Sequence, residues 1–329
     1  MKWHLDIQID KYPFEIHLHD KIFLMGSCFA ENLAIWLKER YFNIFSNPNG
    51  VLFNPISIFN VLNNIIQHPD TFDEKFLFND NGQWKSFLHQ TYFFNENKDE
   101  LKQELINTQK NAHQFLKSSQ YLFITFGSAF IYEHKELKEV VSNCHQLPSN
   151  VFERKLLSVE QIVKHFNELI IELKKMNPDI KIVFSVSPVK YLAYGAINNN
   201  LSKSTLLLAV HQLCLHNDNA FYFPAYELIT DDLRDYRFFK DDLAHPNEMA
   251  VEYVMQKFYE SMLSNNTQSI IKRLEKIIAA QKHQIKNIYS QQTQNFARRM
   301  LDECITLEKE FPYLNLSDKK RYFEQLIQR

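Results

Sequence analysis

Glycine is scarce in this sequence, with only five among 329 residues. Because glycine tolerates positive φ and close backbone approach, each one that is present is expected to meet a need of the backbone. The five are Gly26, Gly50, Gly82, Gly127 and Gly195. Gly26 and Gly127 each close a short apolar run, which predicts that both stand at strand ends.

Cysteine is also rare, and its spacing excludes the usual roles of clustered thiols. The four cysteines form no CxxC pair and no zinc-ligand spacing. They are Cys28, Cys144, Cys214 and Cys304. A reducing compartment would keep them as free thiols. The sequence therefore predicts neither disulfides nor a structural zinc site.

Long apolar runs and a strong net charge are missing too. No stretch reaches the roughly 18 apolar residues that a membrane span needs, and the N-terminus lacks the pattern of a secretory signal. A net charge of -2 draws the chain neither to nucleic acid nor to anionic lipid. With 45% hydrophobic and 23% charged residues, the composition is that of a folded protein. We therefore expect a cytoplasmic protein with no nucleic-acid or membrane partner.

What the sequence does contain is an alternation of strand-like and helix-like segments. Three apolar runs, and a shorter fourth, have the character of buried strands: 21–25, 121–126, 181–186 and 221–223. Apolar residues at helical spacing occupy the segments 31–40, 58–67, 158–175 and 201–216. This order predicts an α/β fold with a parallel sheet, whose active sites collect at the carboxyl ends of the strands.

Two regions depart from this alternation. Residues 68–97 are aromatic and loop-rich and lead into a helical pattern, so we interpret about 68–117 as a cap-like insertion in a domain of 1–262. Residues 263–329 are predicted to form only helices, a C-terminal helical extension. The first helix carries an apolar stripe of Ile270, Ile271, Leu274, Ile277 and Ile278. This stripe would serve either as a dimerisation surface or as a face packed on its own domain.

Ser27 follows Gly26 at the turn from the first strand to the first helix. A hydroxyl there lies beside helix N-terminal amides, which favour developing negative charge. The same position is a routine helix N-cap, so Ser27 alone does not distinguish a nucleophile from a cap. Cys28 next to it suggests a thiol nucleophile, but an isolated cysteine is more often a small buried hydrophobic residue.

Asp242 and His245 are three residues apart near the end of the α/β region, and Pro246 opens the next helix. The proline disfavours a helical conformation at His245 and places its imidazole on the preceding loop. An aspartate at this spacing can hold one ring nitrogen and leave the other free to take a proton from a serine. The alternative is an aspartate that caps the helix beside a surface histidine.

Taken together, these residues resemble a known family. The run Gly26-Ser27-Cys28-Phe29-Ala30 is the signature of GSCFA-domain proteins, and the resemblance covers about residues 20–260. Further ordered segments are similar to the same family: 47–55, 124–132, 140–148, 185–192, 201–209 and 222–246.

That family is itself similar to the SGNH or GDSL-type hydrolases. The resemblance implies a flavodoxin-like three-layer α/β/α fold and a cofactor-free hydrolase with Ser27 as nucleophile, His245 as general base and Asp242 as its orienting partner. The substrate would be a small-molecule or carbohydrate acyl ester, such as an O-acetyl group. Water and another hydroxyl are both open as the acyl acceptor, so the enzyme would be an esterase or an acyltransferase.

The resemblance also implies an oxyanion hole made by a glycine amide and an asparagine side chain. Gly50 is the candidate for the glycine. Gly127 begins the corresponding third block, but Gly127-Ser128-Ala129-Phe130 has no asparagine where the related hydrolases carry one.

Three further polar residues are candidates for the binding site. Asn143 and His145 belong to a family segment and would supply the missing donor, or would form a loop with ordinary hydrogen bonds. Arg234 would hold a carboxylate or phosphate, or would pair with Asp235 or a helix end.

Two other classes of function are open at this stage. One is a binding or scaffold protein that keeps the fold with an incomplete oxyanion hole, and that associates as a homodimer through its C-terminal helices. The other is a metal-dependent phosphoesterase using Asp241, Asp242 and His245, although no second ligand cluster accompanies them and the two aspartates would tend to point apart. We expect no metal.

Overall fold

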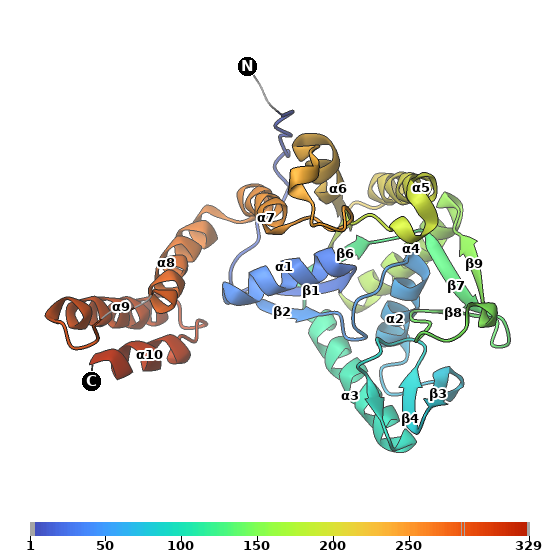
Figure 1. The fold of residues 1–329 in the computed structure, drawn as a ribbon, viewed down its shortest axis with the longest axis horizontal. Helices are drawn as coiled ribbons and strands as arrows, with labels where there is room; N and C mark the ends of the chain where they lie inside the picture. The colour runs from blue at the N-terminus through green and yellow to red at the C-terminus, as the bar shows by residue number, and fades with distance from the viewer. Residues whose placement is uncertain (1–3, 284, 286, 328–329) are drawn as a thin grey trace.

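The centre of the molecule is a five-stranded parallel sheet (Figure 1). The computed structural model describes residues 4–283, 285 and 287–327. The strands lie in the order β11 (Ala220–Tyr222), β10 (Lys181–Val186), β6 (Tyr121–Phe126), β1 (Lys21–Gly26) and β2 (Asn43–Ser46). In chain order this is 2-1-3-4-5, the flavodoxin-like arrangement, which confirms the predicted α/β fold.

Successive residues of a strand point to opposite sides of the sheet, so each face carries apolar side chains. Helices cover both faces. Ile22 and Leu24 of β1 pack into one core with α1 (Cys28–Glu39) and α7 (Glu248–Met262). Phe23 and Met25 pack into a second core on the other face. The helices of that second layer are α2 (Pro55–Gln67), α3 (Lys98–Lys117), α4 (Val159–Met176) and α5 (Gly195–His216). The result is a three-layer α/β/α fold.

Two small antiparallel sheets stand beside this core (Figure 1). The first comprises β3 (Leu77–Asp80), β4 (Gln83–Ser86) and β5 (Phe94–Asn95) and lies inside the predicted insertion. The second, which was not expected, comprises β7 (Phe130–His134), β8 (Glu139–Val141) and β9 (Phe152–Leu156). Phe87 and Phe152 join them in one apolar cluster. The helix that follows the first sheet, α3, buries Ala112 and Leu116 in the layer that covers the central sheet.

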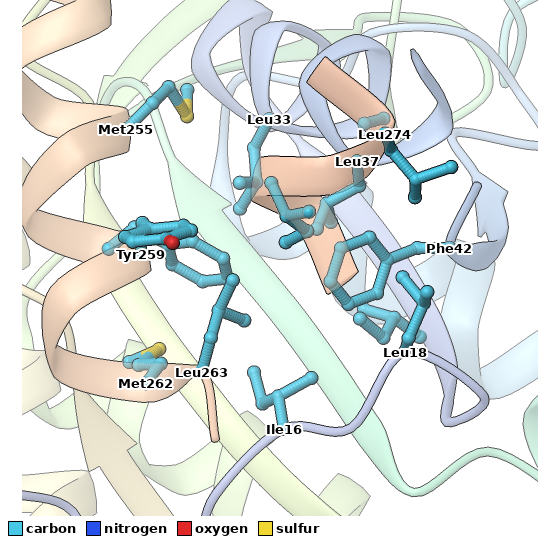
Figure 2. Close-up of a cluster of buried hydrophobic side chains, with 14 of the residues drawn as sticks. Ile16, Leu18, Leu33, Leu37, Phe42, Met255, Tyr259, Met262, Leu263 and Leu274 are labelled. Carbon is cyan, nitrogen blue, oxygen red and sulfur yellow. The ribbon is translucent and has the colours of Figure 1, made fainter. Parts of the chain in front are cut away.

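The C-terminal helices are α8 (Asn265–Lys282), α9 (Gln291–Glu310) and α10 (Ser317–Ile327). They lie on the side of the molecule away from the small sheets (Figure 1). Leu274 of α8 packs in one core with Leu33 and Leu37 of α1 (Figure 2). The predicted stripe therefore packs against its own chain. Dimerisation through the C-terminal helices stays a prediction, and it would need a surface other than this stripe.

Backbone hydrogen bonds join the segment before β1 to the end of α7. The Ile16 amide donates to the Met262 carbonyl at 2.8 Å, and the Ser264 amide donates to the Ile16 carbonyl at 3.1 Å. A short helical turn, α6 (Ala225–Glu227), leads from β11 towards α7. Among the helices of the described residues, none combines the length and hydropathy required to span a bilayer.

Candidate active site

Ser27 occupies the turn between β1 and α1. Gly26 has φ +132°, and a Cβ there would lie 2.2 Å from the Thr125 carbonyl oxygen of β6, so only glycine fits this turn. Ser27 itself is extended (φ -72°, ψ 178°) and stands at the N-cap of α1.

The Ser27 side chain does not act as a cap. Its hydroxyl makes no capping hydrogen bond to α1. Although the residue is 2% exposed, Oγ has no hydrogen-bond partner in the part of the chain that the structure describes. Buried hydroxyls are ordinarily paired, so an unpaired one needs an explanation. Its position on a cavity wall supplies one.

That cavity has a volume of about 520 Å³ and is lined by both Ser27 and His245. It lies at the carboxyl ends of the central strands, where Gly127 follows β6 and Ser187 follows β10. The second small sheet supplies much of the remaining wall. Those wall residues are Phe130, Tyr132, Val141 and Phe152.

His245 is held by Asp242 on the loop before α7. The Nδ1–H of His245 donates to Asp242 Oδ2 at 2.7 Å, because a carboxylate can only accept. Asp242 Oδ1 accepts the backbone amides of Ala244 and His245, each at 2.9 Å. The His245 amide, then the Ala244 amide and the imidazole, lower the pKa of Asp242 to about 2. The carboxylate is therefore ionised at neutral pH and keeps Nε2 of His245 as the free nitrogen.

Ser27 and His245 thus line one pocket, and Asp242 binds His245 without being part of the lining. Within the described residues, Ser27 and His245 make no direct hydrogen bond. Such contacts are often long in a site without ligand and tighten when substrate binds.

Two of the other predicted residues also line the pocket. Gly127 does so, but its amide donates to the Phe53 carbonyl at 2.7 Å. Asn143 also lines the pocket, with its side-chain N–H groups donating to Gln90 Oε1 and Thr91 Oγ1. Neither has a donor free for an oxyanion in this arrangement.

Three predicted residues are not brought to the pocket. The Gly50 amide, the oxyanion donor expected from the resemblance, donates to the Asn47 carbonyl at 2.8 Å within a turn, and Gly50 is not among the pocket-lining residues. His145 is buried against Phe87, with its Nε2–H on the Ser86 carbonyl at 2.9 Å. Burial lowers the pKa of His145. Arg234 is exposed and ends a helical turn at φ +32°, away from the pocket lining.

Sequence reasoning missed Asn54, which lines the pocket at the N-cap of α2. Its Oδ1 accepts the Ser57 amide, and one side-chain N–H donates to Ser57 Oγ at 2.9 Å. No acceptor among the described residues takes the second N–H. The signal was the Asn54-Pro55 pair, since asparagine before a proline at a first helical position is typical of a helix N-cap.

Asp241, Asp242 and His245 were the ligands expected for the phosphoesterase alternative. In the described ranges, no three His, Cys, Asp or Glu side chains gather in a way that would hold a metal ion. The phosphoesterase alternative gains no support from this arrangement.

The strand order and the pocket define an α/β protein with a serine, a histidine and an aspartate at one candidate site. The chain belongs to the GSCFA family, whose sequence model matches residues 21–258. No curated protein matches the chain.

Two solved carbohydrate esterases are similar in structure. A Clostridium thermocellum family 3 carbohydrate esterase is 10% identical, with 78% of this chain and 98% of that chain covered and a TM-score of 0.35. A carbohydrate esterase family 3 protein from Talaromyces cellulolyticus is 8% identical, with 78% and 99% covered and a TM-score of 0.33. At these TM-scores neither likeness supports an argument about this chain.

Proposed function

We propose that this protein is a serine esterase or acyltransferase acting on acyl esters. The observation that carries the proposal is the buried, unpaired Ser27 hydroxyl on the wall of the pocket that also contains His245. Asp242 binds Nδ1 of the histidine, which leaves Nε2 as the nitrogen that would take the serine proton. An activated nucleophile needs such a base, held in turn by a third group.

The proposed reaction begins when His245 Nε2 takes the Ser27 hydroxyl proton as Oγ attacks the ester carbonyl. The tetrahedral intermediate collapses to an acyl-serine, and His245 returns the proton to the departing alcohol. Water or a second alcohol then attacks the acyl-serine by the reverse proton path. Both outcomes use the same residues, so hydrolysis and transfer differ only in the acceptor.

Two groups support the oxyanion in this proposal. The first amides of α1, those of Cys28 and Phe29, have no backbone acceptor in the described chain and carry the positive end of the helix dipole. The remaining side-chain N–H of Asn54 is the second donor. Asn54 thereby takes the role that the absent third-block asparagine would have filled.

The pocket favours an uncharged or anionic ester. No Asp or Glu occurs among its lining residues, whereas Lys190 does. Phe130, Tyr132 and Tyr194 give it aromatic walls, which suit either a sugar ring or an apolar acyl group. A carbohydrate or small-molecule acyl ester fits both features.

The test is labelling of the purified protein with a fluorophosphonate, followed by peptide mass spectrometry. We expect a single modified residue, Ser27, and loss of labelling in the S27A and H245A variants. Labelling at another serine, or equal labelling of the H245A variant, would refute the assignment. A screen of acetyl and longer acyl esters, with protein that the probe labels at Ser27, would then define the substrate.

A ligand-binding protein without catalysis is the second candidate. The separation of Ser27 from His245 favours it, because no hydrogen bond joins the two side chains within the described residues. Absence of Ser27 labelling in a folded sample, together with saturable ligand binding to the pocket, would favour this candidate over the enzyme.

A further inference from the structure

Lys203 is a buried lysine that the proposed reaction does not use. It lies on α5, is 1% exposed, and forms no ion pair within the part of the chain that the structure describes. Its ammonium donates to two backbone carbonyls, Gly127 at 2.6 Å and Ser187 at 2.7 Å. Burial lowers the pKa of Lys203 to about 7. Because burying a lysine without an acidic partner is unfavourable, its location calls for a reason.

The first carbonyl belongs to the wall beside the nucleophile. Gly127 follows β6 and is so close to Ser27 that a Cβ on Gly127 would lie 3.3 Å from Ser27 Cβ. The amides of Gly127 and Ser128 donate to the Phe53 carbonyl at 2.7 and 2.8 Å. Phe53 directly precedes Asn54, so this bond network also fixes the proposed oxyanion donor.

The second carbonyl belongs to the segment that carries the base. Ser187 follows β10, and its hydroxyl accepts the Val189 amide at 3.3 Å. The next amide, that of Lys190, donates to the Ala244 carbonyl at 3.0 Å. Ala244 directly precedes His245. The route from Lys203 to the base therefore consists of two contacts that each involve one side chain and of one contact between backbone groups.

We propose that Lys203 is a positioning residue that sets the spacing between Ser27 and His245 by tying the ends of β6 and β10 together. One ammonium within hydrogen-bond distance of both carbonyls limits how far the two strand ends can separate. Its catalytic consequence rests on the proposed function, but its structural consequence does not. An ordinary structural lysine would stabilise the fold without affecting this spacing.

The experiment compares the Lys203→Met variant with wild type and with Thr205→Val. Methionine keeps the length and apolar stem of lysine but loses the donors. Thr205 is a matched control because it is buried on the same helix and, within the described residues, its hydroxyl bonds only to the Leu201 carbonyl of that helix. Each protein is measured by the rate of fluorophosphonate labelling at Ser27 and by hydrogen exchange with peptide resolution.

For Lys203→Met we expect labelling about 100-fold slower, as for a misplacement of about 1 Å. The loss should be in the maximal labelling rate and not in the reagent concentration that half-saturates it. Exchange should rise in the peptides around 127–130, 187–190 and 242–246 and stay at the wild-type level in α8. Thr205→Val should match wild type in both measurements.

Wild-type labelling and exchange in Lys203→Met would overturn the proposal, as would exchange raised equally throughout the molecule, which is the mark of a structural role. If wild type is not labelled at Ser27, the proposed function fails, and the exchange pattern alone decides whether Lys203 positions the strand ends. If Lys203→Met does not fold, Lys203→Gln takes its place in the same two measurements, with the same slowing expected, because its shorter side chain should lose at least one of the two carbonyls.

Discussion

The Asp242 carboxylate is the residue on which the orientation of His245 depends. It accepts two backbone amides with one oxygen and the imidazole with the other. An asparagine at this position can still accept the two backbone amides with its oxygen. It then presents its N–H group, instead of a second oxygen, to the imidazole ring. The imidazole would then lose the tautomer with a free basic Nε2.

We therefore predict that Asp242→Asn slows Ser27 labelling by on the order of 10³–10⁴-fold. The neighbouring Asp241 is exposed and supplies a matched control, since Asp241→Asn changes the same charge without touching the ring. Labelling rates of the two variants measured side by side are the readout. Equal rates would mean that Asp242 does not orient the base.

The same carboxylate gives a prediction for acid stability. Its pKa in the folded protein is about 2, below the value of about 3.9 for an unperturbed aspartate. A depressed pKa contributes stability that is fully present above the unfolded value and is lost as the pH falls through the folded value. The contribution of Asp242 should therefore disappear between about pH 4 and pH 2.

The check is the urea midpoint of wild type and Asp242→Asn at pH values from 5 to 2. We expect wild type to be the more stable at pH 5 and the difference to shrink as the pH falls through this window. A difference that is independent of pH would show that the charge of Asp242 contributes nothing.

At the scale of elements, the junction of β1 and α1 depends on Gly26. A Cβ there would meet the Thr125 backbone at 2.2 Å, and the residue has φ +132°. We predict that Gly26→Ala destabilises the protein by at least about 2 kcal/mol through overpacking and backbone strain. Gly82, with φ +87° and open space around it, is the control. Gly82→Ala should cost only about 1 kcal/mol.

Urea unfolding of the two glycine variants measures both free energies. Similar losses for Gly26→Ala and Gly82→Ala would show that the strand end shifts to accommodate a methyl group. Ser27 labelling in Gly26→Ala then reports whether such a shift also moves the nucleophile.

How well an element could be predicted from the sequence depended on how local its signal is. The runs at 21–25, 121–126 and 181–186 were recognised within one residue, because continuous apolar strands carry their own signal. The edge strand β2 was not recognised, since Asn43–Ser46 is short and half polar. The sheet β7–β9 was missed because its residues alternate imperfectly and their pairing is set by tertiary contacts.

The residues of the candidate site also differ in how local their sequence signal is. Ser27 stands in a strand-to-helix turn, and Asp242 and His245 stand in one short loop. A few neighbouring residues are therefore enough to indicate each of them. Asn54 lines the pocket, and Lys203 binds the carbonyl of the lining residue Gly127, through the packing of α2 and α5 against the sheet, which no local pattern encodes. Gly50 was an assignment by resemblance, and its amide is engaged in a turn hydrogen bond to the Asn47 carbonyl.

At the scale of the whole molecule, α8 completes a core that begins at α1. Leu274 is fully buried and packs with Leu33 and Leu37 (Figure 2). We predict that Leu274→Ala lowers the free energy of unfolding by about 2–5 kcal/mol. Leu215 on α5 is 67% exposed, and Leu215→Ala is the matched control, with an expected change within about 0.5 kcal/mol.

Chemical denaturation of both leucine variants, followed by circular dichroism, provides the comparison. If Leu274→Ala were as stable as Leu215→Ala, the C-terminal helices would be an independent unit. The domain boundary near residue 262 stays a prediction until that result is known. The expected loss would instead make residues 265–282 part of the core.

Ser27 follows the first strand of the sheet, whereas His245 lies after the last one. During synthesis on the ribosome the growing chain carries its nucleophile from the start but acquires its base only when most of the protein has been made. Prematurely terminated chains that end before the loop at 242–245 would contain a serine without a base. The topology therefore couples the proposed acyl chemistry to near-complete translation, and unfinished chains would have no acyl-transfer activity.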